Sequence, residues 1–316
     1  MHIEISQQKN RGQVSASDYP RDLSPKTGDR HMAKERTIAC PLFFILIAFL
    51  LNGCSTTDPY IGQGPHPQVQ RGRSIPPLDI TASCLAFLSK LVLWNGKFAN
   101  HKISKESEAE LVQFIDERNT QGYPAFKEAV FRLNEYAPMG DLKALFKNHQ
   151  VAWPYKVLFG FTTTIIYDVL LPGRIFPWGD YYNPFTNTAH IYSGESVIGM
   201  HEAGHAYDFA RVRHKGTYVF IGMLNFANLG QEMAATDTVI NYAIQIRNRD
   251  LEYRAYKVLY PAYGTYVGSY VPLPFNSVIG AIGGHIAAHF KVKKRKKVYA
   301  EMDAVQKRSS NADLFV

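Results

Sequence analysis

Apolar side chains recur at helical spacing along much of the chain. The stretch 104–119 places Leu111, Phe114 and Ile115 on one face, which predicts a helix with one buried side. Residues 155–171 are mostly apolar, with Lys156 and Asp168 as the two charged positions. A helix that is apolar all round is usually buried, so this stretch predicts a helix in the core.

Shorter patterns predict two strands and a brief helix. Residues 129–133 and 188–192 are short and rich in β-branched or aromatic side chains, which is typical of strands. Asn183-Pro184 and Asn187 precede the second of these strands and are typical of turns. Residues 141–148 predict the brief helix.

A helix is predicted to begin near residue 193, with Ser193 as its N-cap and Glu195 in the first turn, where the helix dipole favours a negative charge. Gly204 and the nearby alanines would let another backbone segment approach closely. These features predict a buried helix. Its broad inward face consists of Val197, Ile198, His201, His205, Asp208 and Phe209.

This helix carries the sequence His201-Glu202-Ala203-Gly204-His205. Histidines four residues apart lie one turn apart on the same face, so both imidazoles can bind one zinc ion. Glu202, about 100° further round the helix, can polarise a metal-bound water and act as a general base. A glutamate buried between two histidines is costly unless it has a partner, and a metal ion accounts for it.

A catalytic zinc site needs a third protein ligand, and Glu232 is the leading candidate. The alternative for Glu232 is a charge favoured at a helix start by the dipole. Asp237 is the runner-up ligand or a hydrogen-bond acceptor for one histidine. Asp208 lies about 10 Å from the first motif histidine along a straight helix, and His214 would need a sharp turn. His190 is a further candidate, although a histidine on a strand is more often an exposed polar residue. Glu232 shares one helical stripe with Ala235, Val239, Ala243 and Ile246.

A His-Glu-x-x-His helix followed by a helix with a glutamate and then an aspartate resembles the gluzincin branch of the zincin metallopeptidases. The resemblance covers about residues 180–250, and two of its spacings are longer than in thermolysin-like enzymes. It implies an α+β, two-lobed metallopeptidase domain with the motif helix at the active site. It also implies that an edge strand precedes this helix and binds the substrate main chain, which would be residues 188–192.

The same resemblance implies a role for each motif residue. His201, His205 and Glu232 would bind Zn²⁺, and Glu202 would be the catalytic base in peptide-bond hydrolysis. One of the many tyrosines between 253 and 270, or Tyr242, could stabilise the oxyanion, and nothing in the sequence distinguishes them.

The N-terminal region resembles a bacterial lipoprotein signal peptide. Two basic residues precede the apolar run 38–51, which is short for a membrane span, and Leu51-Asn52-Gly53-Cys54 follows. The resemblance implies that Cys54 is lipidated and becomes the mature N-terminus. Ser55 favours sorting to the outer membrane. The alternative interpretation is an N-terminal anchor helix.

Translation is expected to start at Met32, which makes residues 1–31 an upstream extension and 32–53 the signal peptide. Residues 54–77 are rich in Pro, Gly and Gln and are expected to form a flexible tether. The metallopeptidase domain is then expected at 78–260. The mature chain would keep Cys84 as its one thiol, which excludes an intrachain disulfide and predicts a small buried apolar residue.

The C-terminal region combines an apolar segment with a basic tail. Residues 261–290 contain no Asp, Glu, Lys or Arg but include two GxxxG patterns, which are typical of closely packed helices. Pro272 and Pro274 interrupt this segment, so neither half is long enough to span a membrane. The segment is expected either to dip into a membrane or self-associate, or to pack on the domain. The tail 291–316 opens with six basic residues between 291 and 297.

The net charge of +8 does not indicate a nucleic-acid partner. Residues 1–53 contribute seven basic and five acidic side chains, and most of the remaining excess lies at 291–297, which favours contact with anionic lipid. The expected function is therefore a zinc-dependent peptidase of the bacterial cell envelope. It would act on a peptide or protein and contact the membrane through Cys54 and through 261–297. The alternative is a non-catalytic, membrane-associated lipoprotein that binds a partner.

Overall fold

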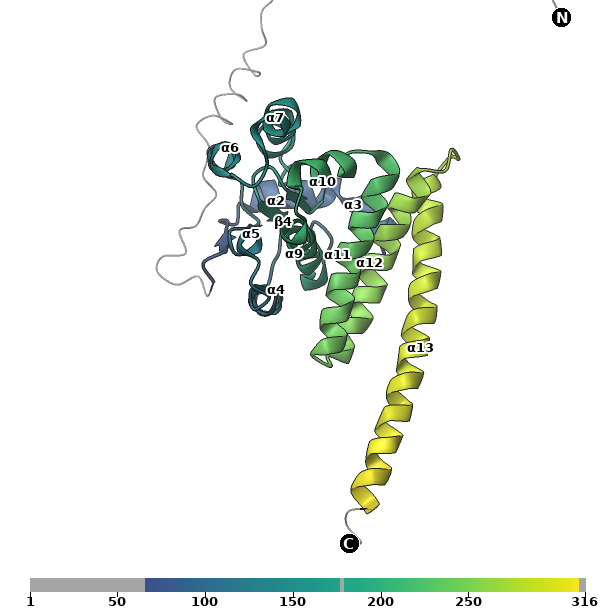
Figure 1. The fold of residues 1–316 in the computed structure, drawn as a ribbon. Helices are drawn as coiled ribbons and strands as arrows, with labels where there is room; N and C mark the ends of the chain where they lie inside the picture. The colour runs from purple at the N-terminus through teal and green to yellow at the C-terminus, as the bar shows by residue number, and fades with distance from the viewer. Residues whose placement is uncertain (1–65, 177–178, 313–316) are drawn as a thin grey trace, which may run out of the picture.

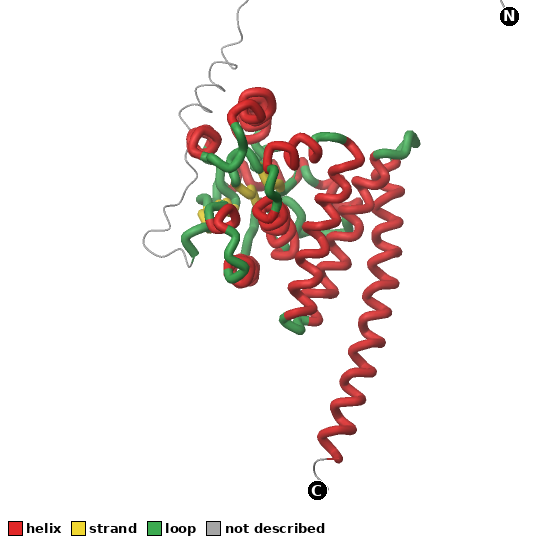
Figure 2. The backbone as a smooth tube through the Cα atoms, viewed as in Figure 1, coloured by secondary structure: helices red, strands yellow, loops and turns green. Residues whose placement is uncertain are grey.

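The computed structural model describes residues 66–176 and 179–312, so the predicted signal peptide and Cys54 lie outside the described residues. Helices dominate and strands are few and short (Figure 2). The first elements are β1 (Val69–Arg71), α2 (Pro76–Leu85), α3 (Phe87–Val92), α4 (Lys105–Asn119), α5 (Pro124–Lys127), β2 (Val130–Leu133), α6 (Pro138–Lys147) and α7 (Trp153–Tyr155). Then come the π-helical turn η1 (Lys156–Gly160), α8 (Phe161–Thr163), the π-helical turn η2 (Thr164–Leu170), β3 (Tyr181–Asn183), β4 (Thr188–Ile191), α9 (Ser196–Arg211), α10 (Lys215–Gly222), α11 (Asn225–Gln245), α12 (Arg249–Ser269) and α13 (Asn276–Ala312).

The four strands form one sheet in the order β1-β2-β4-β3. The first three run parallel, and Phe131 of β2 lies beside both Val69 and Ala189. β3 runs antiparallel to β4, with Tyr182 opposite Ala189. The prediction that 188–192 is an edge strand is therefore wrong, because the preceding segment folds back and adds β3 outside it.

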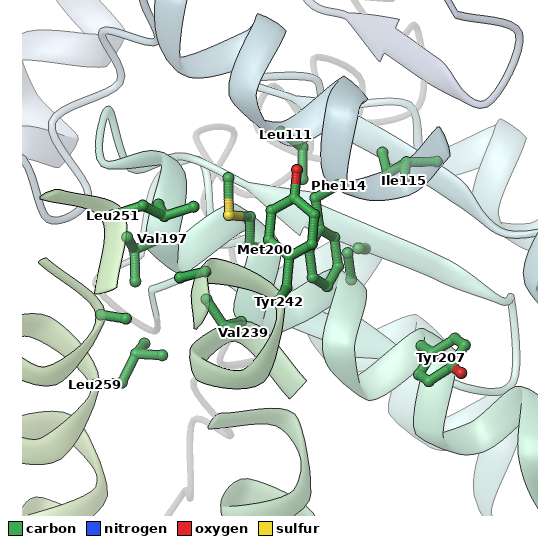
Figure 3. Close-up of a cluster of buried hydrophobic side chains, with 14 of the residues drawn as sticks. Leu111, Phe114, Ile115, Val197, Met200, Tyr207, Val239, Tyr242, Leu251 and Leu259 are labelled. Carbon is green, nitrogen blue, oxygen red and sulfur yellow. The ribbon is translucent and has the colours of Figure 1, made fainter. Parts of the chain in front are cut away.

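The core lies where α4, α9, α11 and α12 meet beside the sheet. Figure 3 shows Phe114 of α4, Met200 of α9 and Tyr242 of α11 in one cluster of buried side chains. The rings of Phe114 and Tyr242 meet edge to face, with centroids 5.0 Å apart. The predicted inward face of α4 is confirmed, because Leu111 and Ile115 are buried in the same cluster.

Most of the predicted elements are confirmed to within a few residues. α4 begins after Ser104, whose Oγ accepts a hydrogen bond from the Ser107 backbone N–H at 3.1 Å. β2 and α6 lie where a strand and a brief helix are predicted, and β4 is the predicted strand before the motif helix. The described chain is mixed α and β, mostly helical with one small sheet.

The stretch 155–171 is helical, but it is not a core helix. It consists of π-helical and α-helical turns, and Val157, Leu158 and Phe161 are largely exposed. Three of its buried side chains are polar: Lys156, Thr164 and Asp168. Asp168 accepts hydrogen bonds from the Tyr181 hydroxyl at 2.6 Å and from the Asn183 side-chain amide at 2.7 Å, and these bonds hold the polar side of the segment against the sheet.

Two smaller predictions are also wrong. Ser193 is not the N-cap of the motif helix, because its hydroxyl donates a hydrogen bond to Asp180 and the helix begins only at Ser196. Cys84 is exposed, because it lies on the outer side of α2.

The boundaries of the predicted tether and tail also differ from the structure. The interval 54–77 already contains β1 and the start of α2, so the ordered domain begins earlier than expected. At the other end, α12 continues through residue 261 and α13 continues through 291 without a break. The expected limits at 260 and 290 therefore do not separate structural units.

α12 and α13 form an antiparallel pair, and α13 extends beyond α12 (Figure 1). The glycines of the GxxxG patterns lie between the two helices. A Cβ on Gly264 would overlap the Gly280 carbonyl, and one on Gly284 would overlap the Tyr260 carbonyl. The small-residue faces of α12 and α13 thus pack against each other within one chain. Among the described residues, no helix is both long and apolar enough to cross a membrane.

Candidate metal centre

The centre forms where α9 and α11 pack closely. A Cβ on Gly204 would lie 3.0 Å from the Ala235 carbonyl oxygen, so the glycine lets the two backbones approach. Ala203 and Ala206 on the same helix are fully buried. This contact brings the histidines of α9 beside Glu232, which lies two turns into α11. Glu232 is therefore not a charge at a helix start.

The side chains of His201, His205 and Glu232 converge on one point. His201 Nε2 lies 3.1 Å from Glu232 Oε2, and His205 Nε2 lies 3.4 Å from Glu232 Oε1. The two Nε2 atoms are 3.2 Å apart. Ligand atoms about 2.1 Å from a tetrahedral zinc are separated by about 3.4 Å, so this donor set fits a zinc ion.

The charges of this group favour a cation among the three side chains. Burial would raise the pKa of Glu232, but the positive charge on His205 and hydrogen bonds to both histidines hold it well below the usual value. Burial opposes the charge on His205, yet Glu232 raises the His205 pKa. A carboxylate between two imidazoles thus stabilises positive charge, whether a proton or a metal ion carries it.

Glu202 is a buried carboxyl beside the three ligands. Burial, together with the negative charges of Glu232 and Asp180, raises the pKa of Glu202 to about 8, although His205 opposes the shift. The backbone N–H of Tyr182 in β3 donates a hydrogen bond to this side chain. A carboxyl with a pKa near neutrality is suited to take up and release a proton.

Two cavities of about 430 and 410 Å³ lie on either side of the centre. His205 and Glu232 line the first, and His201 lines the second. Glu202 lines both, and the centre is therefore bordered by two cavities.

Asp180 and Tyr266 are the two residues besides Glu202 that line both cavities. Asp180 is absent from the predicted site, and Tyr266 is one of the tyrosines that the sequence could not distinguish. Tyr266 comes from α12 and lies opposite the motif helix. The negative charge of Glu232, burial and the charge of Glu202 raise the pKa of its phenol well above the usual value. Asp180 accepts hydrogen bonds from the Tyr192 and Ser193 backbone N–H groups. Tyr266 belongs to the tyrosine run noted in the sequence, whereas Asp180 gives no sequence signal.

The alternative third ligands lie elsewhere. Asp208 accepts a hydrogen bond from the Tyr218 hydroxyl at 2.6 Å, one turn beyond the motif. Asp237 is exposed and lines a groove between α11, α12 and α13. His214 is exposed at the start of α10.

His190 is buried, contrary to the prediction, and belongs to a second polar cluster under the sheet. Its Nε2 lies 3.8 Å from an oxygen of Asp141 and 3.8 Å from an oxygen of Asp168. Burial and the nearby charge of Arg132 hold the pKa of His190 well below the usual value. Arg132 also donates to Asp141 at 2.7 Å. His190 is thus a neutral member of a separate network.

No protein-family model, curated protein or solved structure matches this chain. The function is therefore inferred from the residues and the geometry of the centre alone.

Proposed function

We propose that the protein is a zinc-dependent peptidase. The observation that carries the proposal is the convergence of the side-chain donors of His201, His205 and Glu232 within 3.1–3.4 Å of one another beside Glu202. Two neutral imidazoles and one carboxylate are the ligand set of a familiar class of catalytic zinc site, which leaves a fourth position open for substrate or water.

Zinc held by these residues would supply a Lewis acid that polarises the peptide carbonyl. Glu202 would take the proton from the attacking water and pass it to the leaving amine. Tyr266 would donate its hydroxyl hydrogen to the oxyanion that develops on the carbonyl oxygen.

The substrate main chain would pair with β3 rather than with residues 188–192. β3 is the outer strand of the described sheet, and Tyr181 and Tyr182 line the first cavity together with Glu202 and His205. An extended peptide added to this edge would therefore run past the proposed catalytic base.

The proposed enzyme acts at the bacterial cell envelope. The apolar run before Cys54 and the Gly53-Cys54 box support a lipid-anchored protein, and Ser55 supports the outer membrane. Its partners are then a peptide or protein substrate and the membrane that holds the anchor.

The test measures the metal content of the purified full chain by mass spectrometry and its hydrolysis of a mixed quenched-fluorescence peptide library. One zinc per chain is expected, with cleavage that a chelator abolishes and added Zn²⁺ restores. A chain that binds zinc without cleaving any library member, or that binds no metal, would favour the non-catalytic partner-binding alternative.

A further inference from the structure

Most of the large exposed apolar side chains of the described chain lie in four segments. These segments are 87–94, 153–171, 216–224 and 266–286, and together they are named the apolar rim. Their exposed members include Leu88, Trp94, Trp153, Leu158, Phe161, Leu170, Ile221, Met223, Leu273, Phe275, Ile279 and Ile286. Monomeric soluble proteins rarely expose this much contiguous apolar surface unless it binds something.

The four segments surround the openings of the two cavities. Thr163 and Met223 line the first cavity, so the second and third segments border it. Leu88 and Val278 line the second cavity, so the first and fourth segments border that one. Tyr266, from the fourth segment, lines both. In Figure 1, α7, α10 and the turn between α12 and α13 all lie at the upper end of the molecule.

Direct contacts join neighbouring segments of the rim. The rings of Phe159 and Phe220 lie 5.9 Å apart and connect the second segment to the third. Trp94 stacks on His285 at 4.1 Å, and His285 Nε2 donates to the Val92 carbonyl at 3.1 Å, which connects the first segment to the fourth. These contacts join the four segments into two pairs, one beside each cavity, and Tyr266 lines both cavities.

The rim is almost free of charge. Its ionisable residues other than histidine and tyrosine are Lys90, Lys156 and Asp168, and the last two are buried. It thus exposes no carboxylate that would repel anionic lipid headgroups. The basic residues at 291–297 lie further along α13, beyond the rim, and are not part of this surface.

Two observations point to a bilayer as the partner of this surface. The rim carries exposed amphipathic aromatic residues, with Trp94 at 75%, Trp153 at 59% and Tyr167 at 41% exposure, and such residues prefer the membrane–water interface. In addition, the twelve residues from Cys54 to His66 can span at most about 40 Å, so an anchor at Cys54 would keep the domain close to the lipid.

We propose that the apolar rim rests on the membrane surface, with Phe275 and its neighbours in the α12–α13 turn inserted among the lipids. The cleft would then open at the bilayer. If the proposed peptidase function holds, the substrate class would be peptide segments at the membrane surface, such as the juxtamembrane parts of envelope proteins.

The test places the purified full chain in vesicles of phosphatidylethanolamine and phosphatidylglycerol that contain a lipid photoactivatable in its acyl chain. Mass spectrometry then maps the cross-linked peptides. Cross-links are expected in all four segments of the rim. None are expected near Met302 and Val305, which are also exposed apolar residues but lie at the far end of α13. Cross-links confined to residues before His66, or spread equally to residues 299–308, would overturn the proposal.

Paired variants sharpen the test. Leu273→Asp with Phe275→Asp is expected to lower cross-linking of the whole rim at least fivefold, whereas Met302→Asp with Val305→Asp is expected to leave it unchanged. Equal cross-linking in the two double variants would also overturn the proposal, as would a rim that cross-links to a second copy or to another protein but not to lipid. Lipid cross-linking needs no hydrolysis, and cleavage of soluble peptides needs no vesicles, so this proposal and the peptidase proposal fail separately.

Discussion

In the proposed mechanism, different side chains of the centre bind the metal and transfer the proton. Glu202 lines both cavities but lies outside the group of three converging donors. The variant Glu202→Gln is therefore expected to keep one zinc per chain and to lose peptide hydrolysis by about 10³-fold or more, because the base is removed while the ligands stay. Metal analysis and cleavage of the peptide library check this. Wild-type cleavage by the variant would contradict the role of Glu202 as base.

The third ligand can be tested with a matched pair of acidic residues. Glu232 contacts both histidines. Asp208 lies on the next turn of α9 and accepts a hydrogen bond from the hydroxyl of Tyr218 in α10. Glu232→Ala is expected to weaken zinc binding by at least 10²-fold, and Asp208→Ala to change it little. A zinc titration with a competing chelator measures both. Loss of zinc in the Asp208 variant alone would reassign the ligand.

Tyr266 can be tested against a neighbour on the same helix. Tyr266→Phe is expected to lower kcat about 10²-fold with little change in KM or zinc content, because one donor to the developing oxyanion is lost. Tyr263→Phe is the control, since Tyr263 lines the groove beside α13 and not the two cavities. Equal rates for the two variants would remove Tyr266 from the mechanism.

The residues of the centre differ in how far the sequence could predict them. His201 and His205 share one helix, and their spacing fixes their relative position whatever the rest of the fold does. Glu232 follows from the apolar stripe on its own helix. Tyr266 and Asp180 reach the cleft only through tertiary packing of α12 and of the loop before β3, which no local pattern specifies.

At the scale of elements, the α12–α13 pair depends on glycines at particular positions. A Cβ on Gly280 would overlap the Gly264 carbonyl, whereas one on Gly283 would meet no atom within 4 Å. Gly280→Ala is expected to destabilise the protein by about 1–3 kcal/mol through this overlap. Gly283→Ala is expected to stabilise it by up to about 1 kcal/mol, because alanine favours the helix. Denaturant unfolding of both variants gives the comparison, and equal destabilisation would argue against close packing at Gly280.

Local sequence patterns predicted which segments are helices or strands better than they predicted which side chains are buried. The periodic face of α4 has a single interpretation, and both its limits and its burial are confirmed. The stretch 155–171 is apolar without a clear period, so its helical state could be predicted but the direction of its apolar side chains could not. The order of strands likewise depends on the segment before β4, which folds back and pairs with β4 as β3. This return moves the edge of the sheet from 188–192 to Tyr181–Asn183.

At the scale of the whole molecule, one chain would combine the proposed anchor with the two cavities and the apolar rim. The proposed zinc ligands and the proposed base lie on α9 and α11, and the apolar segments border both cavities beside them. A short link from Cys54 to the domain would limit how far this cleft moves from the membrane. The position of the proposed anchor would thus limit which substrates the proposed enzyme can reach.

Lipidation of Cys54 can be tested directly. When the full chain is expressed in a bacterium with labelled palmitate, the label is expected on Cys54, and the mature N-terminus is expected to begin there. The reasons are the two basic residues, the apolar run 38–51 and the Gly53-Cys54 box, with Met32 as the start. Cys54→Ser should abolish labelling and leave the signal peptide attached, whereas Cys84→Ser, at an exposed thiol, should change neither. Mass spectrometry of the N-terminal peptide decides the outcome, because an unmodified peptide that spans Gly53 and Cys54 would contradict both the lipid anchor and the proposed location at the envelope.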